Sequence, residues 1–283
     1  MKGFNNIGNT CYMNSALHII LNNKYFKHIF NYEYESGLLK IMSELSDVYH
    51  DPNGVHNQVK TISPVSLYKH FGQKHGLFNH GRQNDSTEFL LLFMDDIEEE
   101  IKQYDDKLIR KIYDTKIRNY VKCKIKDCGN VSQTVSYERF LILDMIDNLN
   151  LDSMFENYKS RIKLTDENKW DCDKCKKKTI ASKRLEVLHF PKTLFISIKR
   201  FQYNMRGQYV KDCRSVDIPL YWKQDYQLTG LILHYGNVDG GHYVSCYKVN
   251  NEWFLFNDSH VSTMSEEDVT KVASEAYILV YNR

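Results

Sequence analysis

Apolar residues recur at helical spacing in the first part of the chain, from residue 1 to about 112. The stretch from Cys11 to Leu21 has this pattern, and Asn9 or Thr10 precedes it as a candidate N-cap. A Cys at the start of a helix meets free backbone N–H groups and a partial positive charge. The pattern therefore predicts a mainly helical segment with Cys11 at the N-terminus of one helix.

A second helix start is marked by Asp85 and Glu88, which have the acceptor-x-x-Glu spacing of a capping box. An apolar run from Phe89 to Met94 follows directly, and an acidic stretch from Asp95 to Glu100 comes after it. The sequence predicts a helix whose first half is buried and whose second half is solvated.

Beyond about residue 113 the pattern changes to short segments rich in β-branched and aromatic residues, which are typical of strands. Asn250 and Asn251 separate the last two segments and predict a tight hairpin. Helices followed by strands favour an α+β fold over an alternating α/β fold. The expected strands are Val131–Val135, Phe140–Asp144, Leu185–Phe190, Leu194–Ile198, Leu228–His234, Tyr243–Val249 and Glu252–Phe256.

Composition excludes several classes of protein. The chain has 283 residues, 42% of them hydrophobic, and a formal net charge of +2. It is too apolar to be disordered, and its charge is not the basic footprint of a dedicated nucleic-acid binder. No apolar run approaches 18 residues, and residues 1–15 lack a secretory signal. We therefore expect no membrane or nucleic-acid partner and a reducing location, the cytoplasm or the nucleus.

Four of the seven cysteines form two short-range pairs, a C-x4-C pair and a C-x2-C pair in polar turns. Each pair can form a knuckle, a turn that presents two thiolates, and two knuckles together can supply the four ligands of a tetrahedral Zn²⁺ site. Four protein ligands leave no open position, so one structural zinc is expected; the alternative is a set of buried, inert thiols. The predicted ligands are Cys123, Cys128, Cys172 and Cys175.

Cys11 is the candidate nucleophile, because a helix N-terminus lowers a thiol pKa and offers N–H groups to an oxyanion. His242 follows two glycines at the start of one expected strand, and Asn257 and Asp258 end the next. If these strands form a hairpin, the amide or carboxylate can orient the imidazole, which can then deprotonate a thiol. The pattern indicates a cysteine hydrolase; the alternative is a packing cysteine and an ordinary turn histidine.

Several segments resemble the motifs of the ubiquitin-specific proteases, a papain-like class of deubiquitinating cysteine peptidases. GFNNIGNTCYMNSALH resembles the family's Cys box, and RQNDSTEFLL its Gln-x-Asp-x-x-Glu-Phe segment. LILHYGNVDGGHYVSCYKVNNEWFLFNDSHVS resembles its His box, while PKTLFISIKRFQY and AYILVY are similar to two of its strands. The resemblance covers nearly the whole chain, from residue 3 to 282.

The resemblance implies a single catalytic domain with a papain-like α+β fold. Its helical thumb would be residues 1–112, its zinc-ribbon fingers 113–190 and its palm 191–283. Ubiquitin would rest against the fingers, and its C-terminal Gly-Gly tail would pass between thumb and palm. A monomer that acts as a minimal catalytic core, with no organic cofactor, is expected.

The resemblance also implies residue roles. Cys11 would be the nucleophile, His242 the base and later the acid, and Asn6 a donor to the oxyanion. Either Asn257 or Asp258 orients His242, and Asn257 is favoured, with Asp258 as a close contributor. Further positions match the region that meets the tail of ubiquitin, although Asp85 and Glu88 also have the capping interpretation above. These substrate-binding candidates are Asp85, Glu88, Gly240, Gly241 and Tyr243.

Some positions depart from the family pattern. Phe4 stands where Leu is usual and His18 where Gln is usual, and both are expected to be tolerated. The C-x4-C spacing is wider than the common C-x2-C, which predicts an irregular knuckle that still binds metal. Cys213 and Cys246 match nothing catalytic and are expected to be packing residues.

Three alternatives stay open at this level. The first is a protease for another ubiquitin-like modifier, and the second a catalytically weak or dead ubiquitin-binding module. The presence of Cys11, His242, Asn257 and Asp258 disfavours the second. The third, a zinc-ribbon nucleic-acid binder, is disfavoured by the near-neutral charge.

Overall fold

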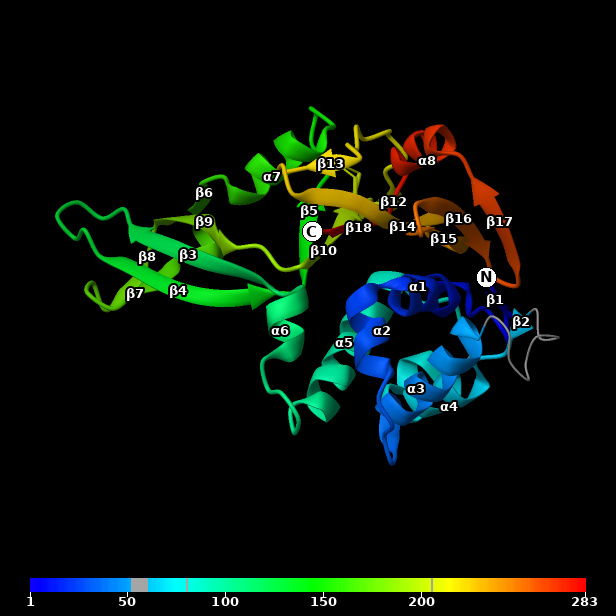
Figure 1. Ribbon diagram of the computed structural model, residues 1–283. Coiled ribbons are helices and arrows are strands. Elements are labelled where there is room, and N and C mark those ends of the chain that lie inside the picture. The colour runs from blue at the N-terminus through cyan, green and yellow to red at the C-terminus, as the bar shows by residue number, and fades with distance from the viewer. Residues whose placement is uncertain (52–60, 80, 205) are drawn as a thin grey trace.

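A buried helix, α1 (Cys11–Asn22), lies at the centre of the fold, and every residue from Cys11 to Leu21 is buried. The structure is a computed structural model that describes residues 1–51, 61–79, 81–204 and 206–283. Figure 1 shows α1 between the large sheet and the other N-terminal helices. These helices are α2 (Lys24–Phe30), α3 (Gly37–His50), α4 (Val65–Lys74), α5 (Ser86–Ile101) and α6 (Leu108–Tyr113).

The predicted helix starts are confirmed. Thr10 is the N-cap residue of α1, although its side chain makes no capping hydrogen bond. Asp85 caps α5, because its side chain accepts from the backbone N–H groups of Thr87 and Glu88. The return contact of a capping box is not formed: among the described residues, the Glu88 carboxylate has no hydrogen bond or ion pair.

A large mixed sheet packs on α1. Its strand order is β17-β16-β15-β14-β18-β10-β5, and β13 pairs with β14. All neighbouring pairs are antiparallel except β10 with β5. The strands are β5 (Phe140–Asp144), β10 (Thr193–Lys199), β13 (Tyr221–Trp222), β14 (Tyr226–Gly236), β15 (Gly241–Val249), β16 (Glu252–Asn257), β17 (His260–Met264) and β18 (Ile278–Asn282).

Both faces of this sheet are buried, which explains the uninterrupted apolar run in β18. Ile278 and Val280 face the core that contains α1, whereas Leu279 and Tyr281 belong to the core on the other face. Helices α7 (Leu151–Lys159) and α8 (Glu266–Ala273) contribute to that second core.

A separate antiparallel sheet with the order β4-β3-β9-β6 projects from the body of the molecule (Figure 1). It carries the short hairpin β7–β8 near its end. The elements of this projection are β3 (Thr115–Cys123), β4 (Val131–Glu138), β6 (Ile162–Leu164), β7 (Trp170–Cys172), β8 (Lys177–Thr179) and β9 (Ala181–His189).

Remaining short elements complete the described chain. Strand β1 (Gly3–Phe4) pairs in parallel with β2 (Thr61–Ile62), and β11 (Phe201–Tyr203) forms a hairpin with β12 (Tyr209–Lys211). Two 3₁₀ turns, η1 and η2, span Gly76–Asn79 and Asp166–Asn168. Among the described residues, no helix has the length and apolar character needed to cross a membrane.

The α+β prediction is confirmed, with one difference in the expected division of the chain. The segment 113–190, expected to form the projecting fingers, also supplies β5 to the large sheet and α7 to the core beneath it. The sequence pattern also missed β3, whose apolar residues are interrupted by Lys and Arg. The hairpin at Asn250 and Asn251 is confirmed, and both residues have the positive φ of a tight turn.

Candidate active site

Cys11 begins α1 at the point where that helix packs on β15. Its thiol is buried and faces the backbone of Tyr243, the residue directly after His242. The side-chain oxygen of Asn6 shapes the loop before Cys11, because it accepts from the backbone N–H groups of Gly8 and Thr10, each at 3.1 Å. Helix α1 thus brings the thiol to the start of the strand that carries the imidazole.

The thiol pKa differs from the sequence-based expectation. Burial raises the pKa of Cys11 above its ordinary value, and the Asp258 carboxylate raises it further. The backbone N–H groups of Tyr243, Tyr12 and Cys11 lower this pKa, as predicted for a helix N-terminus, but burial outweighs them. In this state the thiol is predominantly protonated at neutral pH, so it requires a base.

His242 and Asn257 lie side by side. His242 Nε2 is 2.6 Å from Asn257 Oδ1, although the two residues stand at opposite ends of their strands, β15 and β16. An amide oxygen can only accept, so Nε2 carries a proton, and in the neutral form of the ring the lone pair is then on Nδ1. Among the described residues, Cys11 and His242 are not hydrogen-bonded to each other in this unliganded state.

The Asp258 carboxylate binds two asparagine amides and makes no hydrogen bond to His242 among the described residues. Its Oδ2 accepts from Asn6 Nδ2 at 2.9 Å, and its Oδ1 accepts from Asn14 Nδ2 at 2.8 Å. The backbone of Asp258 has a φ of 49°, a left-handed conformation that aims its side chain differently from that of Asn257. Neighbouring residues therefore contact different parts of the site. Sequence reasoning did not assign Asn14, although this residue lies in the Cys box.

A hollow of about 340 Å³ opens beside this cluster, between α5 and the loop that joins β14 to β15. Three carboxylates line it, those of Asp85, Glu88 and Asp239, and no Lys or Arg does. Gly240 and Tyr243, two of the predicted substrate-binding residues, also line the hollow. The site therefore suits an extended segment with basic side chains.

Asp85 does more than cap α5. Its second oxygen accepts from the hydroxyls of Tyr277 at 2.6 Å and Tyr243 at 3.2 Å, which joins the helix to the sheet. Burial and this nearby carboxylate raise the pKa of both tyrosines, so their hydroxyls stay protonated donors. Glu88, by contrast, is exposed, and its carboxylate has no hydrogen bond or ion pair within the described part of the chain, so it remains available to a ligand.

Gln83 is a site residue that sequence reasoning did not assign. Its side-chain amide donates to the carbonyl of Gly241 at 2.9 Å and accepts from the same residue's N–H at 2.8 Å. This double hydrogen bond connects the helical part to the loop before His242. The sequence signal that could have identified Gln83 is its position as the first residue of the Gln-x-Asp motif.

Gly241 has no room for a side chain. A Cβ at this position would lie 2.3 Å from His234 Nε2 and 2.3 Å from the carbonyl oxygen of Tyr235. Gly236, at the other end of the loop, has a φ of +116°, which other residues rarely adopt. These two glycines allow the loop to close tightly over His234.

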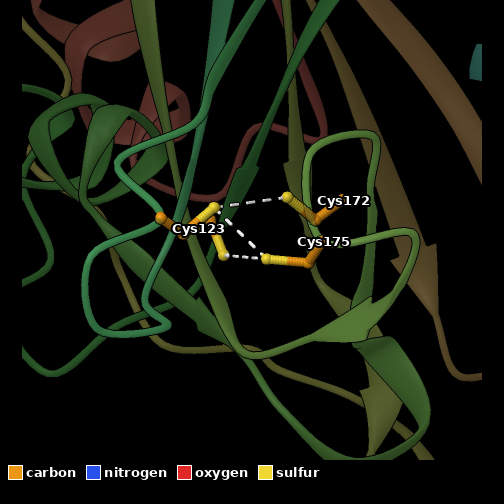
Figure 2. A group of neighbouring side chains, drawn as sticks. Cys123, Cys172 and Cys175 are labelled. Carbon is orange, nitrogen blue, oxygen red and sulfur yellow. Dashed lines mark hydrogen bonds between the residues drawn. The ribbon is translucent and has the colours of Figure 1, made fainter.

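The four predicted metal ligands come together at the end of the projection, and Figure 2 shows three of them converging. Their sulfur atoms all lie within 4.8 Å of one another. Cys128 Sγ is 3.3 Å from Cys175 Sγ and 3.7 Å from Cys172 Sγ, and Cys123 Sγ is 4.0 Å from Cys175 Sγ. Tetrahedral Zn–S bonds of about 2.3 Å require sulfur separations of about 3.8 Å, so this arrangement fits the ion.

Two of the four sulfurs have surroundings that favour the thiolate, whereas the hydrogen bond to Cys128 raises the pKa of Cys175. The Thr179 hydroxyl lowers the pKa of Cys123, while the Asn130 amide, 3.4 Å from Cys172 Sγ, lowers the pKa of that thiol against the effect of burial. The wide C-x4-C knuckle is irregular, as expected, because Asp127 has a φ of 62°. All seven cysteines are free, so none forms a disulfide.

Two cysteines lie outside these clusters. Cys246 is fully buried in the second core, as expected for a packing residue. Cys213 is exposed, so the prediction that it packs is wrong. The residue follows β12 at the surface, where its sulfur has only a weak contact of 3.8 Å to the Lys211 carbonyl.

Comparison with known proteins gives relatives along the whole chain. The family model described as "Ubiquitin carboxyl-terminal hydrolase" matches residues 2–281. Ubiquitin carboxyl-terminal hydrolase 4 of Vanderwaltozyma polyspora is 24% identical over 99% of this chain and 41% of its own length. Ubiquitin carboxyl-terminal hydrolase 42 of Homo sapiens is 29% identical over 99% of this chain and 23% of its own length. The chain thus spans less than half of these curated relatives.

Solved structures share the fold. The SAGA Ubp8/Sgf11/Sus1/Sgf73 DUB module bound to ubiquitin aldehyde contains a chain that matches with a TM-score of 0.84 and 22% identity. The match covers 100% of this chain and 69% of that one. A related structure of the same module, bound to monoubiquitin, matches with a TM-score of 0.83 and 23% identity.

Proposed function

Because this chain belongs to the ubiquitin carboxyl-terminal hydrolase family, we propose that it is a thiol-dependent deubiquitinase. It hydrolyses the bond after the C-terminal glycine of ubiquitin, in isopeptide or peptide linkage. The observation that carries this proposal is the convergence of Cys11, the His242–Asn257 pair and the Asn6–Asp258 pair beside an acidic hollow.

The tautomer of His242 supports a role as general base. Its Nε2–H is engaged by Asn257 Oδ1, so the lone pair on Nδ1 is available to the proton of the Cys11 thiol. Asn257 keeps the ring oriented and favours the imidazolium that forms. Because burial raises the thiol pKa, substrate binding has to bring the thiol and the imidazole into hydrogen-bond contact before attack.

Attack of the thiolate on the glycine carbonyl forms a C–S bond and moves negative charge onto the carbonyl oxygen. Asn6 Nδ2 has two protons and gives one to Asp258, which leaves the second for this oxyanion. His242 then protonates the leaving lysine amine as the C–N bond breaks. Water, deprotonated by His242, cleaves the resulting thioester and regenerates the thiol.

Ubiquitin is the proposed partner. The matching solved structures are bound to ubiquitin aldehyde and to monoubiquitin, which supports the same partner for this chain. The carboxylates of Asp85, Glu88 and Asp239 complement a basic tail, and the tight loop at Gly241 favours a terminus without side chains. A ubiquitin-like modifier with a similar tail is the alternative.

Zn²⁺ is the proposed cofactor, held by Cys123, Cys128, Cys172 and Cys175. The ion would join the two knuckles and stabilise the end of the projection, and it has no part in the chemical steps. Because the ligands and Cys11 must remain reduced, we also propose that the protein works in a reducing compartment, the cytoplasm or the nucleus.

The experiment that tests the function is reaction with full-length ubiquitin carrying a C-terminal thiol-reactive electrophile. Wild-type protein is expected to form a stable adduct, and Cys11→Ser is the matched control that forms none. Parallel probes built from ubiquitin-like modifiers test selectivity. Failure of the zinc-loaded, folded protein to react with the ubiquitin probe would contradict the proposal, and reaction with another modifier would redirect it.

A further inference from the structure

His242 lies between two residues that are hydrogen-bonded to the segment leading into α5. Gly241, directly before it, is bound by the side-chain amide of Gln83, which donates to its carbonyl at 2.9 Å and accepts from its N–H at 2.8 Å. Tyr243, directly after it, donates its hydroxyl to Asp85 at 3.2 Å. The histidine is therefore flanked on both sides by contacts from the same short segment.

Gly241 is the first residue of β15, where the sheet gives this strand a partner on one side only. On that side Gly241 is opposite Gly236, the last pair of the ladder with β14. Strand β16 pairs with β15 only from Ser245 onward, so residues 241–244 have no strand neighbour there among the described residues. A side-chain amide offers the same donor and acceptor as a peptide group. Gln83 therefore supplies to Gly241 what a neighbouring strand would supply.

The two hydrogen bonds of this amide act on two different peptide groups. The N–H belongs to the peptide between Gly240 and Gly241, and the carbonyl belongs to the peptide that joins Gly241 to His242. Because both groups bind one planar amide, backbone rotation is restricted at a residue type that otherwise has the widest conformational freedom. The backbone position from which His242 starts is fixed in this way.

The loop that carries this amide is also bound to the segment around Cys11. Asn9 Nδ2 donates to the carbonyl of Gly81 at 2.7 Å, and the Ser86 hydroxyl donates to the carbonyl of Tyr12 at 3.1 Å. One of these contacts comes before Cys11 in the sequence and the other directly after it. The loop before α5 therefore connects the segment of the thiol to the strand that carries the imidazole.

We propose that Gln83 is a positioning residue that sets the place of His242 relative to Cys11. The inference rests on the proposed function. In that function Asn257 orients the imidazole through Nε2, whereas Gln83 holds the peptide group from which His242 extends. The base has to come within hydrogen-bond distance of the thiol when substrate binds, and a displacement of about 1 Å costs on the order of 10²-fold in rate.

Two variants at position 83 test this role. Gln83→Leu removes both hydrogen bonds and keeps a side chain of similar size, whereas Gln83→Glu keeps the acceptor but loses the donor. We expect each variant to lower kcat for a ubiquitin C-terminal amide substrate about 10- to 100-fold, with KM within about threefold of wild type. Gln103→Leu is the matched control and should change neither value, because Gln103 donates to the Glu100 carbonyl at the other end of α5.

Two alkylations of Cys11 separate positioning from general damage. Ubiquitin with a C-terminal alkyl halide is attacked by the thiol, which loses its proton to His242 as the halide leaves, and no oxyanion forms. Iodoacetamide on the unliganded protein, in a Cys213→Ser background, does not use the base, because Cys11 and His242 are not hydrogen-bonded there among the described residues. Gln83→Leu is expected to slow the first reaction as much as it lowers kcat and to leave the second unchanged.

Three kinetic results would overturn the proposal. They are a wild-type kcat in either variant at position 83, a change confined to KM, and equal slowing of the two alkylations. A change confined to KM would show that Gln83 contacts the tail of ubiquitin instead of positioning the base, and equal slowing would show general damage around Cys11.

The contact can also be measured without any activity. Hydrogen exchange of glycine-labelled wild type is expected to show a protected Gly241 N–H, because Gln83 accepts from it. In Gln83→Leu this N–H is expected to exchange about 10-fold faster or more. An unprotected Gly241 N–H in wild type would overturn the proposal. If this N–H is protected but the wild type fails to cleave ubiquitin, the proposed function fails instead.

Discussion

The carboxylate of Asp258 accepts a hydrogen bond from the side-chain amide of Asn6 at 2.9 Å, across 252 positions of the sequence. This contact joins the end of the β16 hairpin to the loop before the nucleophile. The adjacent residue, Asn257, contacts His242 instead. Under the proposed function, Asn257 would therefore orient the base, and Asp258 would orient the donor to the oxyanion.

This division predicts different kinetic defects for Asn257→Ala and Asp258→Ala. Both are expected to lower kcat for ubiquitin substrates, Asn257→Ala by about 10²- to 10⁴-fold and Asp258→Ala by about 10- to 10³-fold. Alkylation of Cys11 by a ubiquitin probe with a C-terminal alkyl halide uses the base, which bound ubiquitin brings to the thiol, but forms no oxyanion, so only Asn257→Ala should slow it. If Asp258→Ala slows alkylation as strongly, Asp258 is the residue that orients His242.

The burial of Cys11 predicts the pH dependence of the free enzyme. Because its folded pKa is raised, the thiolate fraction is small at pH 7 and grows as the pH rises through that pKa. Alkylation rates in a Cys213→Ser background, which removes the exposed thiol, should therefore have a midpoint above 9.0. Asp258→Asn removes a negative charge that raises the pKa, so it should move the midpoint down. A midpoint near neutrality in the parent would show a preformed thiolate–imidazolium pair.

Much of this site was predictable from sequence because its chemistry lies in short segments with strong local signals. Cys11 follows a glycine-containing turn before an apolar helix, and Asn257 follows a β-rich segment, so each stands at the end of an element. The same holds for Asp85, whose capping role depends only on the next three residues.

Other features depend on contacts between distant segments and could not be found in that way. The raised pKa of Cys11 results from how deeply α1 is buried under the sheet, a tertiary property that outweighs the local N–H groups. The double hydrogen bond from Gln83 to Gly241 spans 158 positions. Strand β5 was found with its correct bounds, but its place in the large sheet depends on pairing with β10.

The cysteine cluster predicts one Zn²⁺ per chain, measurable by elemental analysis of the purified protein. Cys172→Ser removes a ligand and is expected to lose the ion. Without the ion, the two cysteine pairs at the end of the projection are no longer joined. The midpoint temperature of thermal unfolding is therefore expected to fall and KM for ubiquitin to rise. Cys213→Ser is the matched control, since that cysteine is exposed and remote from the cluster, and it should change none of these values. A folded wild type without metal would contradict the assignment.

Gly241→Ala tests the tight loop before His242. The new Cβ would meet His234 Nε2 and the Tyr235 carbonyl at 2.3 Å, so the loop has to move and shift His242. Activity is expected to fall about 10²-fold or more, because a displacement of about 1 Å costs that much in a positioned site. Gly76→Ala is the control, as its Cβ would meet nothing within 4 Å. Near-normal kcat in Gly241→Ala would show that the loop adapts without moving the base.

The ion pairs of Arg139 indicate how the projection is fixed to the helices. Its guanidinium bonds Asp95 at 2.6 Å and Glu98 at 2.6 Å on α5, and Asp114 at 3.0 Å just before β3. The Arg139 and Asp114 side chains are only 9% and 6% exposed, so Arg139→Ala leaves a buried carboxylate unpaired. The free energy of unfolding is then expected to fall by about 3–5 kcal/mol, measured by denaturant titration of the zinc-loaded protein.

The matched control for Arg139 is the surface pair of Lys199 and Asp144, whose side chains are 52% and 58% exposed. Lys199→Ala is expected to change stability by less than about 1 kcal/mol, because solvent screens exposed pairs. Arg139→Ala combined with Asp114→Asn should recover part of the loss, since the second change removes the unpaired charge. If Arg139→Ala lowers the free energy of unfolding by no more than Lys199→Ala does, the buried network does not fix the projection. Arg139→Ala is also expected to raise KM for ubiquitin, because the projection is less firmly held. An unchanged KM in Arg139→Ala would likewise show that the network does not fix the projection.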